Sequence, residues 1–262
     1  MIEETADGLE GRGIIGVRAG FLVAWAEERD RQFREEVPLF RETEIPQRAI
    51  RVLARLRGMA PPPAELRWND EAATALSAPE EVAAVVDGYS NAFLHHMAPV
   101  ADATVTLERL AGRGFVLGIL SNWPYAATID RFAEAHGWLP YLRSIVISQR
   151  VGTIKPHPRI FRAAETALGF EPRPAQAPTT AAEPLPILHV GDDWAADVVG
   201  ASQAGWRTAY LRDRQHDTPL PTSPRAGARG NDDPAASIVP DLEIDELAEL
   251  DALVDLAGTR TT

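Results

Sequence analysis

Three aspartates stand close together in the segment GDDWAADVVGA, residues 191–201, directly after the apolar run ILHV at 187–190. Asp192, Asp193 and Asp197 carry like charges that repel one another, so a neutralising cation is expected nearby. Acidic side chains also cap helix N-termini and complement the helix dipole, which would account for one or two of them. The third remains unexplained, and a metal ion held by carboxylate oxygens is the chemistry that three acids favour.

Two further sets of polar groups follow apolar runs elsewhere in the chain. Ser121 and Asn122 come directly after FVLGIL at 115–120, and Lys155 comes shortly after SIVI at 144–147. A hydroxyl, an ammonium group and carboxylates at one site suit a phosphoryl group, because the hydroxyl hydrogen-bonds its oxygens, the lysine offsets its charge and the carboxylates hold Mg²⁺. Taken singly, Ser121 and Asn122 would be helix caps, and Lys155 would be a turn residue on the surface.

The elements that must position these residues alternate between strand and helix. Short apolar runs predict strands at 115–120, 144–147, 187–190 and 207–211, and helical spacing predicts helices at 104–112, 128–136, 158–168 and 195–204. This order predicts an α/β fold, a doubly wound parallel sheet with helices on both faces. Because the carboxyl ends of parallel strands share one edge of the sheet, the polar residues are expected to meet there.

The chain is expected to hold two domains. Residues 1–13 are polar and glycine-rich, which predicts a frayed N-terminus. Residues 14–98 have helical spacing without strand-like alternation and predict a helical module, whereas residues 99–262 hold the α/β domain. Two segments rich in proline and alanine, 171–186 and 213–236, are expected to be insertions or connectors.

Composition excludes several classes of function. The 262 residues carry a formal charge of −12, which argues against a nucleic-acid partner, and no apolar run is long enough for a membrane span. Cysteine is absent, so disulfides and thiolate sites are excluded, and a cytoplasmic location is expected. His95 and His96 are adjacent on a predicted helix and would point in different directions, so they make a poor metal pair. His189 alternates within a strand and is expected to be a core residue.

Four short segments together resemble motifs II, III and IV of the haloacid dehalogenase-like (HAD) hydrolase superfamily. They are LSN at 120–122, GTIKP at 152–156 and VGDDWAAD at 190–197, followed by GASQAG at 200–205. Their order and spacing both fit, and the resemblance covers residues 95–250. It implies a Rossmann-like HAD core, and the helical module lies where members with a helical (C1-type) cap insert their lid.

The resemblance also implies roles for individual residues. Ser121 and Asn122 would bind the transferring phosphoryl group, and Lys155 would steady it, so that Ser121 and Lys155 belong to the catalytic set. Asp192 would be a Mg²⁺ ligand and Asp197 the second, supporting acid of the metal site, with Asp193 as a further candidate ligand.

One family motif has no counterpart in the chain. The superfamily carries Asp-x-Asp on its first strand, where the first Asp is the nucleophile, and that strand lies between the strands equivalent to 115–120 and 187–190. Asp7 follows no apolar run, so the nucleophile is assigned to no residue. Without the first strand two central strands would lose their ladder partners, which is costly. The expectation is that the chain starts late, that the DNA upstream encodes an apolar strand ending in Asp-x-Asp, and that this chain alone is inactive.

The resemblance leaves three functions open. The leading interpretation is a Mg²⁺-dependent phosphatase that acts on a small phosphorylated substrate through an aspartyl-phosphate. The second is a catalytically inactive HAD-like protein that binds or scaffolds. The third, a haloacid dehalogenase, is less favoured, because displacing a halide needs no cation and the dehalogenases of this group lack the metal carboxylates.

Overall fold

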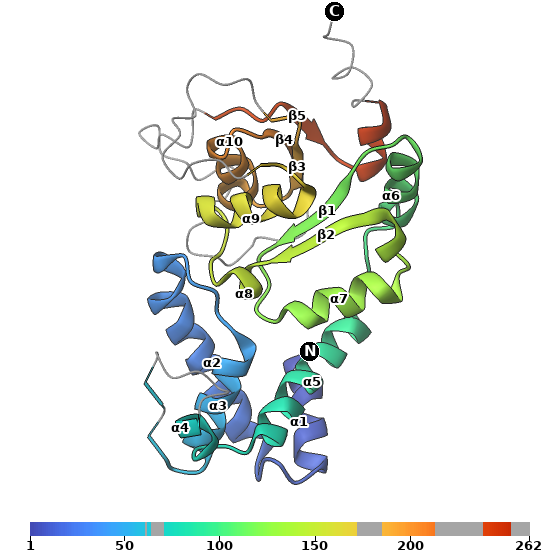
Figure 1. Ribbon diagram of the computed structural model, residues 1–262. Helices are drawn as coiled ribbons and strands as arrows, with labels where there is room; N and C mark the ends of the chain where they lie inside the picture. The colour runs from blue at the N-terminus through green and yellow to red at the C-terminus, as the bar shows by residue number, and fades with distance from the viewer. Residues whose placement is uncertain (61, 64–70, 172–184, 213–237, 253–262) are drawn as a thin grey trace, which may run out of the picture. The chain divides into compact units, whose positions relative to one another are not determined.

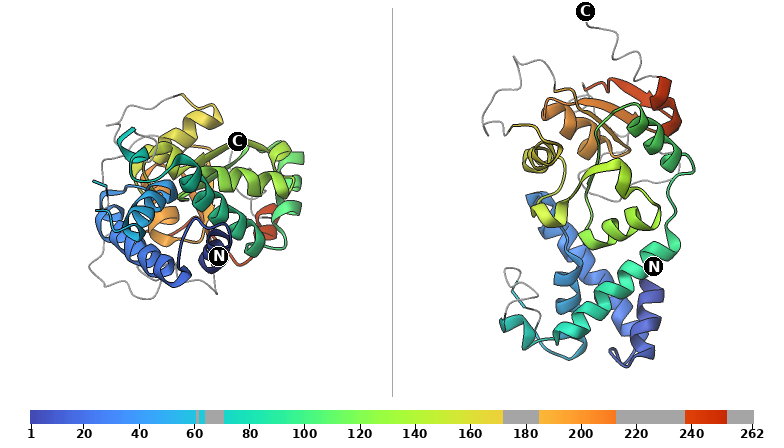
Figure 2. Two further views of the ribbon diagram at one scale, coloured as in Figure 1. Left: turned by 90° about the horizontal axis from the view of Figure 1, so that it is seen from below. Right: turned by 45° about the vertical axis from the view of Figure 1, so that its right-hand side comes forward.

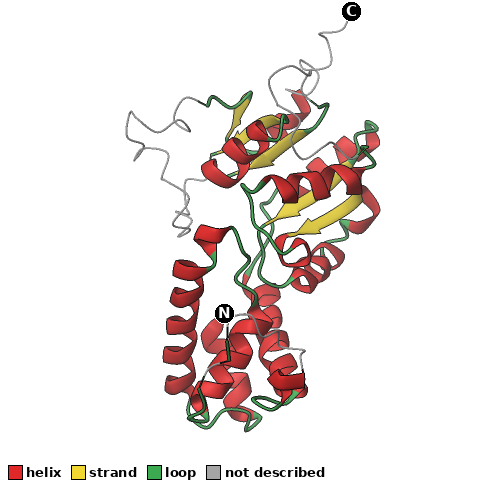
Figure 3. Ribbon diagram, turned by 60° about the vertical axis from the view of Figure 1, so that its left-hand side comes forward, coloured by secondary structure: helices red, strands yellow, loops and turns green. Residues whose placement is uncertain are grey.

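The computed structural model describes residues 1–60, 62–63, 71–171, 185–212 and 238–252 (Figure 1). The chain divides into two compact units. The first, called the helical unit, consists of residues 1–98 and 123–132, and the second, called the α/β unit, consists of residues 99–122 and 133–262. Among the described residues, strands occur only in the α/β unit (Figure 3). The segments 171–186 and 213–236, expected to be insertions or connectors, fall largely outside the described residues.

The helical unit buries one apolar core between its helices. Its elements are α1 (Ile2–Gly11), α2 (Arg18–Glu35), the short helix η1 (Val37–Leu39), α3 (Ile45–Leu56), α4 (Glu71–Thr74), α5 (Pro79–His96) and the first part of α7 (Ala126–Ala135). Phe21 and Trp25 from α2, Ile50 and Leu53 from α3, and Val85 from α5 form the centre of this core. Apolar residues three and four positions apart fall on one face of a helix, which explains why these segments bury a stripe against one another.

The N-terminal residues form a helix, which differs from the prediction. Residues 1–13 were expected to be frayed, but α1 lies beside α5 (Figure 2) and buries Thr5, Ala6 and Leu9. The helices approach closely at Gly88 of α5, where a Cβ atom would stand 3.0 Å from Cγ2 of Thr5. The spacing of Ala6 and Leu9 is helical, and their burial outweighs the low helix propensity of the glycines in α1.

The α/β unit alternates strands and helices in the predicted order. Its elements are α6 (Ala103–Gly112), β1 (Leu117–Ser121), the end of α7, η2 (Leu139–Tyr141), β2 (Leu142–Ile147), α8 (Ser148–Val151), α9 (Pro158–Leu168), β3 (Leu188–Gly191), η3 (Trp194–Val199), α10 (Gly200–Gln203), β4 (Arg207–Leu211), β5 (Leu242–Ile244) and η5 (Leu247–Glu249). All described pairings are parallel, β1 with β2, and β4 with both β3 and β5. No described helix is both long and apolar enough to cross a membrane.

Apolar clusters cover the strands on two faces. Leu117 of β1 and Leu188 of β3 contact the cluster around Leu110 of α6, whereas Leu120 of β1 contacts the cluster around Phe161 of α9. Because successive side chains of a strand point to opposite faces, these two clusters lie on opposite sides of the strands. The unit therefore has the doubly wound α/β architecture that the sequence predicts.

The strands nevertheless form two separate sheets within the described residues. One holds β1 and β2 and the other holds β3, β4 and β5, so β1 and β3 are not hydrogen-bonded to each other or to a strand between them. None of the five residues of β1 is fully buried, although the apolar run at 115–120 suggested a buried central strand. An open strand edge leaves side chains and backbone groups partly accessible, which accounts for the difference.

Candidate phosphoryl-binding site

Lys155 joins the ends of two strands that belong to different sheets. Its Nζ atom donates a hydrogen bond to the carbonyl oxygen of Leu120 in β1 at 3.0 Å and to Oδ1 of Asp197, which follows β3, at 2.5 Å. The lysine side chain is only 8% exposed. The structure thus brings together the carboxyl end of β1, the turn at 152–156 and the segment after β3, as expected for the edge of a parallel sheet.

The Asn122 side chain holds the backbone of Lys155 through two hydrogen bonds. Its Oδ1 atom accepts a hydrogen bond from the Lys155 amide at 2.7 Å, and its Nδ2 atom donates to the Lys155 carbonyl at 3.2 Å. The next peptide bond, Lys155–Pro156, is cis. Ser121 lies between Leu120 and Asn122, both of which contact Lys155, so its hydroxyl belongs to the same strand end. Asn122 therefore acts as a positioning residue for the lysine.

Asp197 accepts hydrogen bonds from three donors. Besides Lys155, the Nε2 atom of His189 lies 2.8 Å from Oδ1, and the backbone N–H of Asp193 donates to Oδ2 at 3.0 Å. Burial alone would raise the pKa of Asp197, but the charge of Lys155 and the hydrogen bond from His189 outweigh it and hold the pKa well below its ordinary value. Asp197 is therefore an ionised, buried carboxylate whose acceptor capacity is largely used.

His189 supports this arrangement as a neutral side chain. Burial lowers its pKa, since the charged form is disfavoured away from water, and the hydrogen bond to Asp197 opposes this only in part. An ionised carboxylate only accepts hydrogen bonds, so Nε2 of His189 must carry the proton that it shares with Asp197. The sequence identified His189 as a core histidine, and the structure adds that it orients an acid of the site.

The other two aspartates have different roles. The Asp193 side chain is buried and accepts a hydrogen bond from the Ala196 amide at 2.9 Å, which caps the π-helical segment Trp194–Val199. Asp192 is exposed at the end of β3. A regular helix was expected at 195–204, and a π-helical segment in its place is a feature that often marks functional sites.

These contacts bear on the predicted metal ligands Asp192, Asp197 and Asp193, which stay a prediction. Asp197 was expected to help hold Mg²⁺, but it lies against the Lys155 ammonium, which repels a second cation, and Asp193 is engaged in the cap. Asp192 is the exposed carboxylate of the three. Mg²⁺ commonly binds through one or two carboxylates, with water and substrate phosphate completing its shell, so Asp192 with a bound phosphoryl group fits this ion.

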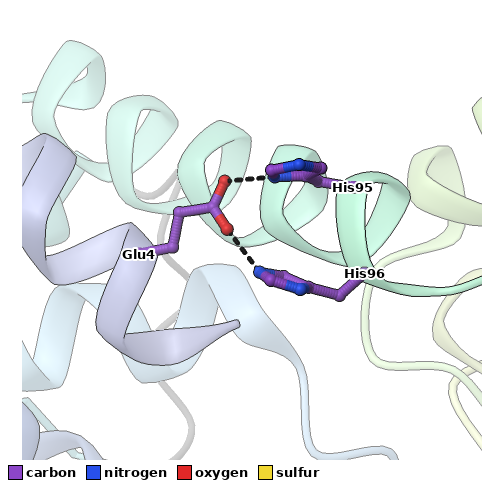
Figure 4. Close-up of side chains that lie close together, drawn as sticks. All are labelled: Glu4, His95 and His96. Atoms are coloured by element: carbon purple, nitrogen blue, oxygen red, sulfur yellow. Dashed lines mark hydrogen bonds and ion pairs between the residues drawn. The ribbon is translucent and has the colours of Figure 1, made fainter.

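A second cluster of chemical groups lies in the helical unit. His95 and His96 were expected to diverge, but Figure 4 shows both rings directed at Glu4 of α1. Nδ1 of His95 lies 3.1 Å from Oε1 of Glu4, and Nε2 of His96 lies 2.6 Å from Oε2. The two histidines are the last residues of α5, and they contact the same carboxylate through different ring nitrogens. The directions of their Cβ atoms along the helix do not predict this, because each ring can turn about its side-chain bonds. Their hydrogen bonds hold the pKa of Glu4 below its ordinary value.

Comparisons with known proteins identify the family. Residues 17–205 match the family model described as "Hydrolase: haloacid dehalogenase-like hydrolase". The chain is 31% identical to the glyceraldehyde 3-phosphate phosphatase of Methanopyrus kandleri over 180 residues. The aligned residues make up 68% of this chain and 66% of that protein. Over 176 residues the chain is 28% identical to the ribulose-1,5-bisphosphate 5-phosphatase of Halopiger xanaduensis, 67% of this chain and 65% of the relative. The matches thus span slightly less than two thirds of these relatives.

A solved structure shares the fold. The 2-haloacid dehalogenase of Pseudomonas syringae pv. Tomato superposes with a TM-score of 0.58 at 22% identity, covering 97% of this chain and 92% of that one. At this identity the likeness concerns the arrangement of helices and strands alone. It assigns no role to individual site residues.

Proposed function

The chain belongs to the haloacid dehalogenase-like hydrolases, and from that premise we propose that it carries the phosphate- and metal-binding half of a phosphatase site for a small phosphorylated substrate. The observation that carries this proposal is the fixed ammonium of Lys155. An ammonium has three N–H donors, and two of them point at Leu120 and Asp197. The third is left to bind an anionic oxygen at the carboxyl end of β1.

The proposed chemistry divides among the residues at this edge. The Ser121 hydroxyl donates to a phosphoryl oxygen, Lys155 neutralises part of its charge, and Asp197 with Asn122 keeps the lysine in place. Asp192 would hold Mg²⁺ against the same phosphoryl group, and the bound ion would further offset the negative charge that builds up during transfer. These residues bind and orient, so the reaction still needs a nucleophile.

We propose that the nucleophile is an aspartate on a strand that fits between β1 and β3. The described parts of these two strands have no common partner there, and in the family this position belongs to the strand with Asp-x-Asp. In the proposed reaction a carboxylate oxygen of that aspartate bonds to phosphorus while the bond to the leaving oxygen breaks, and the leaving oxygen takes a proton from the second aspartate. Water then hydrolyses the aspartyl-phosphate to free phosphate.

The relatives bear on the choice between phosphatase and dehalogenase. Those cited above are named for glyceraldehyde 3-phosphate and ribulose 1,5-bisphosphate, both small phosphorylated sugars or sugar derivatives, which supports a substrate of that class here. The dehalogenase alternative draws on fold likeness alone. The helical unit has the sequence position of the family's helical cap, and we propose that it selects the substrate.

Binding and turnover test the proposal separately. Calorimetry on the 262-residue chain should show that MgCl₂ strengthens the binding of inorganic phosphate, and that Asp192→Asn removes this effect while Asp245→Asn, an exposed control, retains it. If neither MgCl₂ nor Asp192→Asn changed the affinity for inorganic phosphate, the proposed site would be refuted.

Turnover is then measured with p-nitrophenyl phosphate and glyceraldehyde 3-phosphate. The chain joined at its N-terminus to an apolar strand that ends in Asp-x-Asp should hydrolyse them with Mg²⁺. Replacing the first of the added aspartates by asparagine should stop the reaction. The inactive-binder alternative predicts Mg²⁺ and phosphate binding without turnover in both forms, and the dehalogenase alternative predicts Mg²⁺-independent release of halide from 2-chloropropionate.

A further inference from the structure

Three groups that commonly bind metals meet on the surface of the helical unit. They are the Glu4 carboxylate on α1 and the imidazoles of His95 and His96 at the end of α5 (Figure 4). One ligand atom from each residue lies within 4.8 Å of the other two. The three residues are 43%, 72% and 49% exposed, so an ion in solution can reach them.

The orientation of the rings directs both donor nitrogens to one place. The ring centroids of His95 and His96 lie 4.9 Å apart with planes inclined by 32°, and each ring faces a different oxygen of the same carboxylate. The rings thus stand side by side with their nitrogens turned toward α1. A cation bound by all three groups would replace the hydrogen-bonding protons that now link them.

The donor set identifies the class of ion. Two imidazole nitrogens and one carboxylate oxygen suit zinc and its first-row neighbours, whereas Mg²⁺ and Ca²⁺ prefer an all-oxygen shell. Zinc bonds of about 2.0–2.2 Å place neighbouring ligand atoms about 3.3 Å apart in a tetrahedron. The widest pair must therefore close by at most about 1.5 Å, which rotation of exposed side chains supplies.

We propose that Glu4, His95 and His96 form a zinc site with three protein ligands and one solvent-facing position. It is separate from the phosphoryl-binding residues, which lie in the other unit, and it does not depend on the proposed function. The bound ion ties α1 to α5. The helix also buries Thr5, Ala6 and Leu9, and its acidic residues contact Arg18 of α2, so the site adds a clamp between the N-terminal helix and α5.

Calorimetry with ZnCl₂ tests the site on untagged, chelator-treated chain, with millimolar MgCl₂ present to occupy oxygen-only sites. We expect one tight zinc site, and His95→Gln or His96→Gln should weaken it about tenfold or more, since each removes one ligand of three. Glu4→Gln, which keeps the size of the side chain, should also weaken it. His136→Gln removes a histidine of the α/β unit and should leave the affinity unchanged.

Two further measurements test the proposal. The absorption of bound Co²⁺ reports on the coordination geometry, and amide hydrogen exchange reports on whether the ion holds α1 to α5. Co²⁺ should give the visible absorption of a low-coordinate site in the wild type and lose it in both histidine variants. Zinc should slow amide exchange in residues 2–11 of the wild type and of His136→Gln, but not of His95→Gln. Circular dichroism confirms that each variant is folded. Zinc affinity equal in the wild type and both histidine variants would overturn the proposal, as would an exchange rate in residues 2–11 that zinc leaves unchanged.

Discussion

The Nζ atom of Lys155 and the Oδ1 atom of Asp197 lie 2.5 Å apart, and both side chains are more than 90% buried. This ion pair links the turn after β2 to the segment after β3, two parts of the chain that belong to different sheets in the described residues. A buried ion pair of this kind is costly to break on one side only, because the remaining charge stays buried without its partner. Replacing either partner alone should therefore destabilise the α/β unit.

Asp197→Asn should lower the free energy of unfolding by about 3–5 kcal/mol, the usual cost of leaving a buried charge unpaired. The asparagine has the same shape but no charge to balance the ammonium of Lys155. Urea unfolding followed by circular dichroism measures the change. The control is Asp245→Asn, because Asp245 pairs with Arg212 at 3.1 Å while both are about 40% exposed, and should cost less than about 1 kcal/mol. Equal losses in the two variants would contradict the buried-pair interpretation.

Gly191→Ala should disturb the same carboxylate through size alone. A Cβ atom at Gly191 would overlap the carboxylate of Asp197, which cannot retreat without releasing Lys155 and His189. We expect a loss of at least about 2 kcal/mol, in the range of overpacked cores.

The matched control for this glycine lies in the other unit. Gly8 is helical and exposed, and outside its own stretch of helix no atom lies within 4 Å of the place that a Cβ atom would take, so Gly8→Ala should raise the unfolding free energy by about 0.5–1 kcal/mol. Thermal unfolding of both variants distinguishes the two effects by sign. A neutral Gly191→Ala would mean that the Asp197 side chain has room to move.

The sequence predicted the elements that depend on local patterns. Helix α9 and strand β4 begin and end where the apolar spacing places them, and Lys155 meets the end of β1 because parallel strands put their carboxyl ends on one edge. Helix α1 was missed because its glycines suggest disorder, while the burial that stabilises it depends on α5, far along the chain.

The roles of the acids could not be assigned from spacing alone. Asp192, Asp193 and Asp197 share one segment, but a cap, an ion pair and an exposed carboxylate differ only in what surrounds each one. For the same reason the sequence did not predict a role for Glu4, because its partners at the end of α5 are more than 90 residues away along the chain. Contacts between distant segments decide these roles, and neither propensity nor local pattern encodes them.

Glu28→Gln should destabilise the helical unit. The Glu28 carboxylate is 2% exposed and lies 2.7 Å from Nη2 of Arg31 and 2.6 Å from Nε of Arg51. Burial alone would lower the pKa of Arg31, but hydrogen bonds to Glu28 and Glu35 raise it above its ordinary value. A glutamine can keep its amide oxygen beside both guanidinium groups, but it has no charge to balance these two largely buried cations, so we expect a loss of about 3 kcal/mol in urea unfolding.

The preceding residue on α2 offers the control for this variant. Glu27 pairs with Arg55, but their side chains are 54% and 35% exposed, so water screens the pair. Glu27→Gln should therefore cost less than about 1 kcal/mol. If Glu27→Gln were the more damaging of the two, burial would not be what sets the strength of these ion pairs.

His157 gives the stability a dependence on pH. Its Nδ1 atom accepts a hydrogen bond from the Arg159 amide at 3.2 Å and caps α9, a role that needs the neutral ring. Burial, followed by the charges of Arg162 and Arg159, lowers the pKa of His157 below the ordinary 6.5. Below about pH 6.5 the unfolded chain thus binds more protons than the folded one, so this contribution is complete above that pH and declines as the pH falls.

His157→Asn isolates this contribution, because asparagine is a good cap that does not titrate. The unfolding free energies of wild type and variant should be similar at about pH 8, and at about pH 5 the wild type should be the less stable of the two. Every other titrating group is common to both proteins, so the difference between their urea curves reports on His157. A difference that stays constant between the two pH values would show that protonation of His157 is not coupled to folding.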